Sequence, residues 1–407
     1  MIDKNLNSFK YDELMSRYQS HVDTYNALYR LKTNNEEDLK EIFHKIKTNL
    51  IALHNCSPTD IISDISAMSR YNNRCMKSYI QLVKLIYDEY KPTEKITTVF
   101  PFDYLFYKEY GIFFDKDTKD FLEDFESQNL ILNIHEENTV YRAIMDDDIG
   151  LLISFTNIDD FDKNQTLNNE LYPDTEEEFS LLELCCYYGS VNCFKLLISK
   201  FKSEITARCL RLSFLGGNPE IISECLKYQK PDEKCMEFAI ISRNIDFVSF
   251  LKNEYNIEID PFCCSDCINL QAFFIYLDQT NDIKDCFVYS PKFHMTSLCE
   301  YFISRGVDIN AQNEEGKTVL YYASSEERGE MVEFLISKGA DINAKDKNDE
   351  NPLHGAAYMD NIDAAKSLIS HGANINETDN DGATPLDQAN YGCCEEMIEF
   401  LNSLGAC

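Results

Sequence analysis

The sequence lacks any long uncharged apolar run, and no stretch approaches the roughly 18 residues that a membrane span needs. Its first residues, Met1 to Lys4, form no basic segment followed by an apolar run, so we expect no signal peptide. Tryptophan is absent, which decides little. The 16 cysteines show no disulfide-framework spacing, because they are scattered and several lie inside apolar helical stretches. Together these absences predict a reducing compartment inside the cell, the cytoplasm.

Basic residues are also scarce. The chain has 38 Lys and Arg against 70 Asp and Glu, a formal net charge of -32. Phosphate backbones and anionic lipids repel such a polyanion. We therefore expect neither nucleic acid nor a membrane surface as a partner, and a basic protein surface as a better one. The alternative is that the acidity only keeps the chain soluble.

Catalytic and metal-binding motifs are missing too. None of the seven histidines lies in an H-E-x-x-H motif or beside a recognisable nucleophile motif. The segment Cys263-Cys264-Ser265-Asp266-Cys267 contains a C-x-x-C, but no second pair exists and the next histidine is His294. Because zinc needs four ligands, we interpret these cysteines as buried or helix-end thiols.

Two other segments resemble binding motifs only superficially. Gly216-Gly217-Asn218-Pro219 lacks the G-K-[ST] ending of a phosphate loop and is predicted to be a turn between two helices. The acidic clusters 146–148 and 176–178 lack the spacing of an EF-hand and are interpreted as solvated loop charge. The sequence therefore predicts no catalytic residue, no metal and no cofactor, in a protein that is not an enzyme.

What the sequence does contain is enough apolar material for a core and an internal repeat. Hydrophobic residues make up 44% of the chain. Its length of 407 residues exceeds what one compact core usually organises, so we expect several units or an elongated array. A period of 33 runs through the last quarter of the chain. It is marked by the glycines Gly306, Gly339, Gly372 and Gly405. In phase with them recur Thr318-Val319-Leu320, Asn351-Pro352-Leu353 and Thr384-Pro385-Leu386, and then Leu335, Leu368 and Leu401.

The chemistry of one repeat predicts two helices and a turn. Thr or Asn caps the first helix, where Pro at the first position costs no hydrogen bond. The second helix carries apolar residues at helical spacing, such as Val332 and Leu335, and Gly supplies its left-handed end. One such unit cannot bury its own apolar face, whereas stacked units bury a continuous one.

The period and the strings resemble the ankyrin repeat, whose signature is close to Thr-Pro-Leu-His-x-Ala. Leu353-His354 matches it best, Tyr321 and Asp387 replace the His in the other two units, and the unit from Thr384 looks like a C-terminal capping repeat. The resemblance implies an all-α solenoid over residues 298–407. It also implies a buried hydrogen-bonding role for His354.

The resemblance further implies a partner-binding surface, because ankyrin arrays bind proteins through their turn tips and the concave face of their first helices. We expect these side chains to be unnecessary for stacking the repeats. Tyr358, Met359 and Tyr391 are the predicted affinity anchors, since large apolar side chains on an open face contribute most to an interface. The alternative is a solvated face, with the partner on the N-terminal helices. The expected residues are Gln312, Glu314, Glu315, Lys317, Ser325, Glu326, Lys345, Lys347, Asn348, Glu350, Tyr358, Met359, Thr378, Asn380, Asp381, Ala383, Tyr391 and Gly392.

Upstream, residues 136–297 repeat the pattern in weaker form. The spacing from Cys185 to Leu197 recurs from Ala239 to Leu251 and, more faintly, from Ala143 to Phe155. We interpret this region as degenerate ankyrin-like helix pairs with shortened turns. The alternative is an ordinary helical domain whose helices happen to pair.

Residues 1–135 differ and predict a helical N-terminal bundle. Apolar residues mark one face over 14–28, 39–53, 61–68 and 79–86, with Ser57-Pro58 opening the third helix. Residues 91–101 should break the bundle, and the polar stretch 157–178 is predicted to be an exposed loop. Several upstream strings are similar to the large ankyrin family of trichomonad protists, in which a domain of unknown function precedes clear repeats. They include Tyr71-Asn72-Asn73-Arg74, Ser213 to Pro219 and Tyr276 to Asp282.

Three functions remain open from the sequence. The leading one is a non-catalytic interaction module or scaffold that binds a partner protein through the ankyrin face. The second is an adaptor that recruits a partner to a larger machine, with the N-terminal domain as a second docking surface. The third is an enzyme with its active site in the N-terminal region. The partner's identity and the oligomeric state stay open.

Overall fold

The computed structural model describes residues 10–92, 96–114, 130–158, 160–173, 177–326 and 329–406. Over these residues the regular secondary structure is helical, apart from an isolated bridge and one antiparallel pair of two-residue strands, β1 (Thr166–Leu167) and β2 (Phe179–Ser180). The predicted all-α class is confirmed. Within the described part of the chain, no helix is long and apolar enough to cross a membrane. Glu176 and residues 93–95, which two of the predicted segments include, lie outside the described residues.

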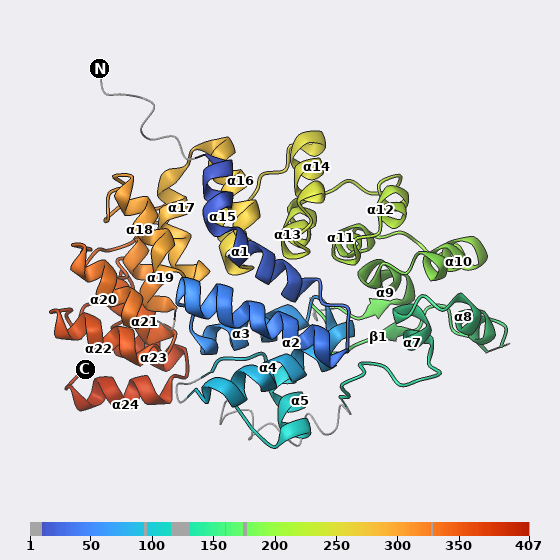
Figure 1. Cartoon of the computed structure of the whole chain (residues 1–407), viewed down its shortest axis with the longest axis horizontal. Helices are drawn as coiled ribbons and strands as arrows, with labels where there is room; N and C mark the ends of the chain where they lie inside the picture. The colour runs from blue at the N-terminus through green and yellow to red at the C-terminus, as the bar shows by residue number, and fades with distance from the viewer. Residues whose placement is uncertain are drawn as a thin grey trace. The chain divides into compact units, whose positions relative to one another are not determined.

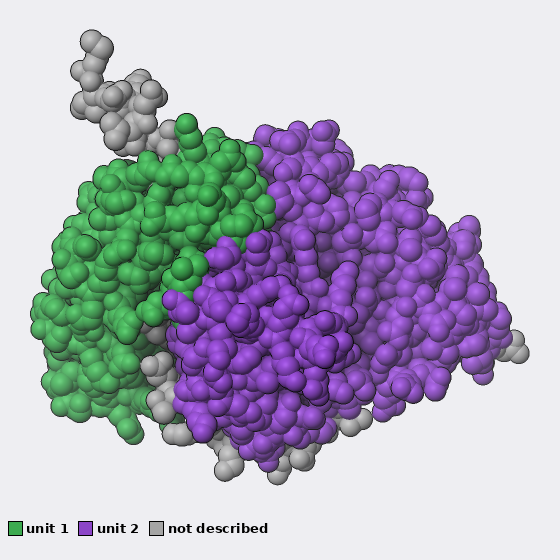
Figure 2. Space-filling view, in the orientation of Figure 1, with its two compact units in different colours: residues 1–19, 53–56, 261–407 green, residues 20–52, 57–260 purple. Residues whose placement is uncertain are grey.

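The chain divides into two compact units, coloured separately in Figure 2. Unit 1 comprises residues 1–19, 53–56 and 261–407, and unit 2 comprises residues 20–52 and 57–260. The described helices up to residue 110 are α1 (Tyr11–Tyr29), α2 (Glu36–Lys45), the π-helical η1 (Ile46–Ala52), α3 (Pro58–Ser69), η2 (Asn73–Cys75), α4 (Met76–Tyr90) and α5 (Phe100–Tyr110).

The helices predicted in the first ninety residues are present, and their boundaries follow local chemistry. Ser57 accepts a hydrogen bond from the Thr59 N–H and Pro58 opens α3, as predicted. Lys91 ends α4 in a left-handed conformation, where the break was expected. One detail differs. The apolar face predicted to continue to Leu53 ends early, because η1 is a π-helix with wider turns, and Leu53 is exposed.

In unit 2, helices follow one another as four pairs after residue 139 (Figure 1). The first helices of the pairs contact one another in sequence, which extends the pairing into a stack. The predicted turn at 216–219 is confirmed, since Gly217 is left-handed, Asn218 caps the next helix and Pro219 opens it. The pairs are α7 (Val140–Met145) with α8 (Ile149–Thr156), α9 (Leu181–Tyr188) with α10 (Val191–Phe201), α11 (Ala207–Gly216) with α12 (Pro219–Cys225), and α13 (Glu233–Ile241) with α14 (Ile245–Tyr255).

Two expectations about polar segments in unit 2 hold only in part. Most of the described residues of 157–178 are exposed, but Leu171 and Tyr172 are fully buried, and the Tyr172 ring packs against Tyr187 of α9. The acidic cluster 146–148 is not merely solvated either. Asp148 caps α8, and Asp147 accepts hydrogen bonds from the Asn192 and Cys193 N–H groups at the start of α10. These carboxylates satisfy helix ends, which leave unpaired N–H groups.

Unit 1 carries the clear repeats (Figure 1). Thr318, Asn351 and Thr384 cap their helices through the side chain, and Gly339 is left-handed with φ +94°, so the predicted caps and helix ends are confirmed. The first turns of α1 belong to this unit, and the Tyr18 hydroxyl donates a hydrogen bond to the Ser297 carbonyl at 3.0 Å. Its other helices are α15 (Pro261–Asp266), α16 (Leu270–Thr280), α17 (Ile283–Tyr289), η4 (Ser290–Phe293), α18 (Thr296–Ser304), α19 (Val319–Ser325), α20 (Gly329–Ser337), α21 (Pro352–Tyr358), α22 (Ile362–Ser370), α23 (Pro385–Tyr391) and α24 (Glu395–Ser403).

Candidate functional site

The turn tips before α19, α21 and α23 share one construction. At each tip a short polar side chain folds back onto its own loop: Asn313, Asp346 and Asp379 each accept two backbone hydrogen bonds through Oδ1. The N–H groups come from the residues two and four positions later, at 2.8–3.1 Å. Such side-chain turns fix the loop without help from a partner. The tips are therefore ordered before any ligand arrives.

Neighbouring tips are also joined to one another. The Lys347 N–H donates to the Glu315 carbonyl, and one repeat later the Asn380 N–H donates to the Asn348 carbonyl, both at 2.9 Å. Side chains take part as well, because the Gln312 amide donates to the Lys345 carbonyl at 2.9 Å. The Asn380 amide likewise donates to the Lys347 carbonyl at 3.0 Å.

These bonds correct one premise of the predicted binding surface. Its side chains were expected to be unnecessary for stacking, and for Gln312 and Asn380 that is wrong. Glu350 also bridges repeats, since its carboxylate accepts a hydrogen bond from the Tyr321 hydroxyl at 2.9 Å. Glu326 pairs with Lys292 at 2.6 Å. A side chain on this face lies beside the equivalent position of the next repeat, so polar groups bond across the stack.

Two lysines of the predicted binding surface, Lys345 and Lys317, form ion pairs that partly neutralise their charge. Lys345 lies 2.8 Å from the Glu377 carboxylate, which raises the pKa of Lys345 and lowers that of Glu377. Lys317 lies 3.5 Å from Glu315. Exposed pairs of this kind contribute little to stability. They do reduce the number of unpaired cations on an acidic surface.

The remaining predicted residues lie at the surface. The exposed polar positions on the tips are Glu314, Lys347, Asn348, Thr378 and Asp381, and Ser325 and Ala383 are half-buried. Gly392, the last of the expected set, is exposed at the end of α23.

Three large apolar side chains project from this surface. Tyr358 is 52% exposed, Met359 49% and Tyr391 74%. They lie at the ends of α21 and α23, which pack together. The two ends touch, because the Cys394 thiol donates to the Tyr358 carbonyl at 3.3 Å. We call Tyr358, Met359 and Tyr391 the tyrosine patch. Exposed apolar clusters with a polar border mark interaction sites.

His354 occupies a buried position between repeats, as predicted. Its Nδ1 accepts from the Asn351 N–H at 3.3 Å, and its Nε2 lies 3.2 Å from the Ala383 carbonyl of the next repeat. Burial lowers the pKa of the imidazole, so the neutral ring is favoured. The histidine therefore cross-links repeats and is closed to a ligand.

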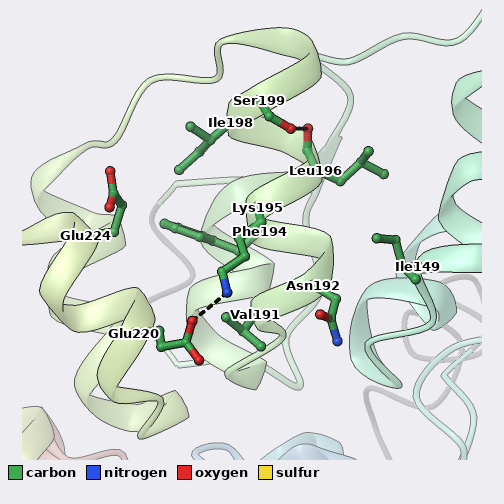
Figure 3. Close-up of a pocket in the computed structure, with 10 residues that line it drawn as sticks. All are labelled: Ile149, Val191, Asn192, Phe194, Lys195, Leu196, Ile198, Ser199, Glu220 and Glu224. Atoms are coloured by element: carbon green, nitrogen blue, oxygen red, sulfur yellow. Dashed lines mark hydrogen bonds and ion pairs between the residues drawn. The ribbon is translucent and has the colours of Figure 1, made fainter.

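Two sizeable hollows lie at the surface formed by the described residues of unit 2. One, of about 500 Å³, lies along α10 and is lined chiefly by apolar side chains such as Val191, Phe194 and Ile198 (Figure 3). Across it Lys195 forms an exposed ion pair with Glu220 at 2.5 Å. The other hollow, of about 660 Å³, is lined by residues of the N-terminal helices and of α9, α11 and α14.

A buried hydrogen-bonded chain beside the second hollow was missed at the sequence level. The His135 Nε2 lies 2.6 Å from the Tyr172 hydroxyl, which lies 2.5 Å from the Tyr188 hydroxyl. Tyr188 in turn donates to the Asn73 side chain at 3.0 Å. Burial lowers the pKa of His135 to about 4. The four residues include no Ser, Cys or carboxylate, and the chain joins the segment after α3 to α9. Its sequence signal was only the pair Tyr187-Tyr188.

The cysteines of residues 263–267 are buried or lie near a helix end, as the sequence predicted. Cys264 is buried in α15, and Cys263 and Cys267 are half-buried at that helix and the turn after it. Over the described ranges, no group of three or more His, Cys, Asp and Glu side chains is placed to hold a metal ion.

The repeated helix pairs, capped tips and left-handed glycines define a repeat solenoid of the ankyrin class. A family model described as ankyrin repeats (3 copies) matches residues 284–346 and 330–407. Residues 284–407 are therefore ankyrin repeats, and a further model, described as a domain of unknown function (DUF3447), matches residues 201–276 ahead of them. No curated protein matches the chain. The likeness to the trichomonad family stays a prediction.

Proposed function

We propose that the chain is a non-catalytic interaction module or scaffold that holds a basic partner protein on the ankyrin face of residues 298–407. The observation that carries the proposal is the tyrosine patch, which exposes three large apolar side chains on adjacent helix ends. Ankyrin repeats support a protein-binding role in general. Central aromatic side chains dominate the energy of most interfaces, whereas rim charges contribute little.

The expected basicity of the partner follows from charge. Residues 303–407 hold 20 acidic and 7 basic side chains. Several of the seven already pair with carboxylates, Lys345 and Lys317 among them. A ligand that approaches this surface therefore meets negative potential. A basic surface would be drawn to the acidic border, and its apolar groups would then bury the tyrosine patch.

The proposal uses a reduced set of the predicted residues. Gln312, Glu326, Glu350 and Asn380 hold the repeats together, so we assign them to support of the surface. Glu314, Lys347, Asn348, Thr378 and Asp381 are exposed and form the proposed polar border. We place the protein in the cytoplasm, because most of its cysteines are thiols buried in helices.

The test compares proteins captured from a cell extract by the full-length wild type and two variants. Tyr358→Ala/Tyr391→Ala removes most of the tyrosine patch, and Tyr228→Ala is the matched control, since Tyr228 is 63% exposed in unit 2. The proposal expects a basic protein that the control retains and the double variant loses. A partner captured equally by all three proteins would contradict it.

A further inference from the structure

Unit 2 contains a hollow whose charge is opposite to that of the chain as a whole. Its volume is about 660 Å³. Among its lining residues, Arg30, Lys32 and Arg74 are basic and Asp246 alone is acidic. The protein carries a net charge of -32, so a local excess of cations is unusual for it.

Hydrogen bonds to the backbone hold the segment that carries two of these cations, Arg30 and Lys32. The Asn72 side-chain amide donates to both the Tyr29 and the Leu31 carbonyls, each at 3.0 Å. Leu31 is buried, while Arg30 and Lys32 on either side of it are exposed. Arg30 lies in the turn that ends α1 and Lys32 follows in the connector, so the buried Leu31 separates two exposed cations.

The positive charges are not cancelled by carboxylates. Arg30 donates to the Arg243 carbonyl at 2.8 Å, and Arg74 donates to the Tyr188 carbonyl at 3.1 Å. Carbonyl groups orient a guanidinium but leave its charge in place. Within the part of the chain that the structure describes, Arg30, Lys32 and Arg74 form no ion pair.

Contacts with Tyr188 also hold Arg74 in place. Its guanidinium lies 5.2 Å from the centre of the Tyr188 ring, and it follows Asn73, which is buried and bonded to Tyr188. The buried chain through His135 and Tyr172 thus supports one wall of the hollow. A site on ordered elements loses less entropy when it binds a ligand.

We propose that this hollow binds an acidic peptide segment of a second partner protein. Its volume lies within the range of about 300–1,000 Å³ typical of ligand sites and exceeds what a single carboxylate or phosphate fills. Arginine suits carboxylate recognition because its planar fork donates two parallel hydrogen bonds. The acidic remainder of the chain interferes little, since charges beyond about 8 Å are screened at physiological ionic strength.

The inference goes beyond the proposed function and is independent of it. The ankyrin face is acidic and is proposed to take a basic partner, whereas the hollow would take an acidic one. Two surfaces of opposite charge preference would let one chain hold two different proteins, which favours the adaptor over a simple scaffold.

The test measures binding of a fluorescein-labelled glutamate-rich peptide to the full-length protein by anisotropy. Lys32→Glu is the informative variant, because Lys32 is exposed and its side chain has no hydrogen bond in the described part of the chain, so we expect the variant to fold. Lys230→Glu is the matched control, an exposed lysine of unit 2 that does not line the hollow. We expect Lys32→Glu to weaken binding by about fivefold or more, and Lys230→Glu to have little effect.

Three outcomes would overturn the proposal. Equal weakening by both variants would show only a general effect of net charge. A lysine-rich peptide that binds in a Lys32-dependent way would reverse the inferred charge preference. Saturable binding of inorganic phosphate that depends on Lys32, without binding of the peptide, would assign the hollow to a small anion instead. Thermal unfolding of each variant confirms that it is folded, and Lys32→Arg, which keeps the charge at the exposed Lys32, should retain binding.

Discussion

Gly392 packs directly against Tyr358: a Cβ placed on Gly392 would lie 2.6 Å from the Tyr358 carbonyl oxygen and 2.8 Å from the Cys394 sulfur. The φ of Gly392 is -75°, so the backbone conformation itself suits any residue. The glycine is needed for space, because the ends of α21 and α23 approach backbone to backbone. This contact sets the spacing between Tyr358 and Tyr391, the two rings of the tyrosine patch.

Gly392→Ala should therefore destabilise the last repeat by about 1–3 kcal/mol, the usual cost of overpacking. Gly150→Ala is the matched control, because its Cβ would meet only the end of the Asp148 side chain and α8 gains a better helix former. The measurement is urea unfolding of the full-length protein. Equal stabilities for Gly392→Ala and wild type would contradict the close approach.

Gly339→Val should destabilise the array for a different reason. A Cβ at Gly339 would meet no atom within 4 Å, so sterics between helices play no part. Its φ of +94° resists a β-branched residue at a cost of about 1 kcal/mol or more. Gly339→Asn should cost less, since Asn tolerates left-handed helix ends. Identical thermal midpoints for the Val variant and wild type would remove Gly339 as a helix stop.

The stability of unit 2 should depend on pH through His135. Burial lowers its folded-state pKa to about 4, so folding favours the neutral ring. This stabilisation is complete above the unfolded value of about 6.5 and is lost as the pH falls toward 4, a change of up to about 3 kcal/mol. Urea midpoints measured from pH 7 to pH 4 should fall more steeply for the wild type than for His135→Gln. Parallel profiles would show that His135 does not titrate as described.

Removal of metal should leave the protein folded. The prediction rests on the single C-x-x-C of Cys264 and Cys267, which lacks a second pair of ligands. Structural zinc contributes directly to folding, so its removal lowers the melting temperature. Thermal unfolding with and without a chelator makes the comparison, and elemental analysis of the purified protein completes it. A sharp drop in melting temperature, or stoichiometric zinc, would show that the cysteines bind metal.

The sequence predicted those features that arise from local chemistry. Caps such as Thr318 and Asn351, and left-handed ends such as Gly339, depend on a few neighbouring residues, so a period of 33 was enough to place them. The burial of His354 followed from the ankyrin resemblance and is present.

Features that depend on distant partners could not be predicted. Glu350 accepts a hydrogen bond from Tyr321, 29 residues away, so nothing in its own loop marks it as structural. Tyr172 lies in a polar stretch, and its burial depends on contacts with distant residues such as His135 and Tyr188. At the hollow proposed to bind an acidic peptide, Arg30 donates a hydrogen bond to the carbonyl of Arg243, which lies 213 residues away in the sequence. Such pairings follow from the packing of helices and leave no periodic trace.

The central claim is that the tyrosine patch and its acidic border form the surface that binds a basic partner. The most direct test is the binding kinetics of a captured partner with full-length wild type, Tyr358→Ala and the control Tyr228→Ala, at low and high salt. The account predicts that association slows as salt rises for all three, because the attraction is screened. It also predicts that Tyr358→Ala dissociates about tenfold faster or more, as expected when a central aromatic anchor is lost. A strongly acidic partner, or binding indifferent to both salt and Tyr358, would contradict the account.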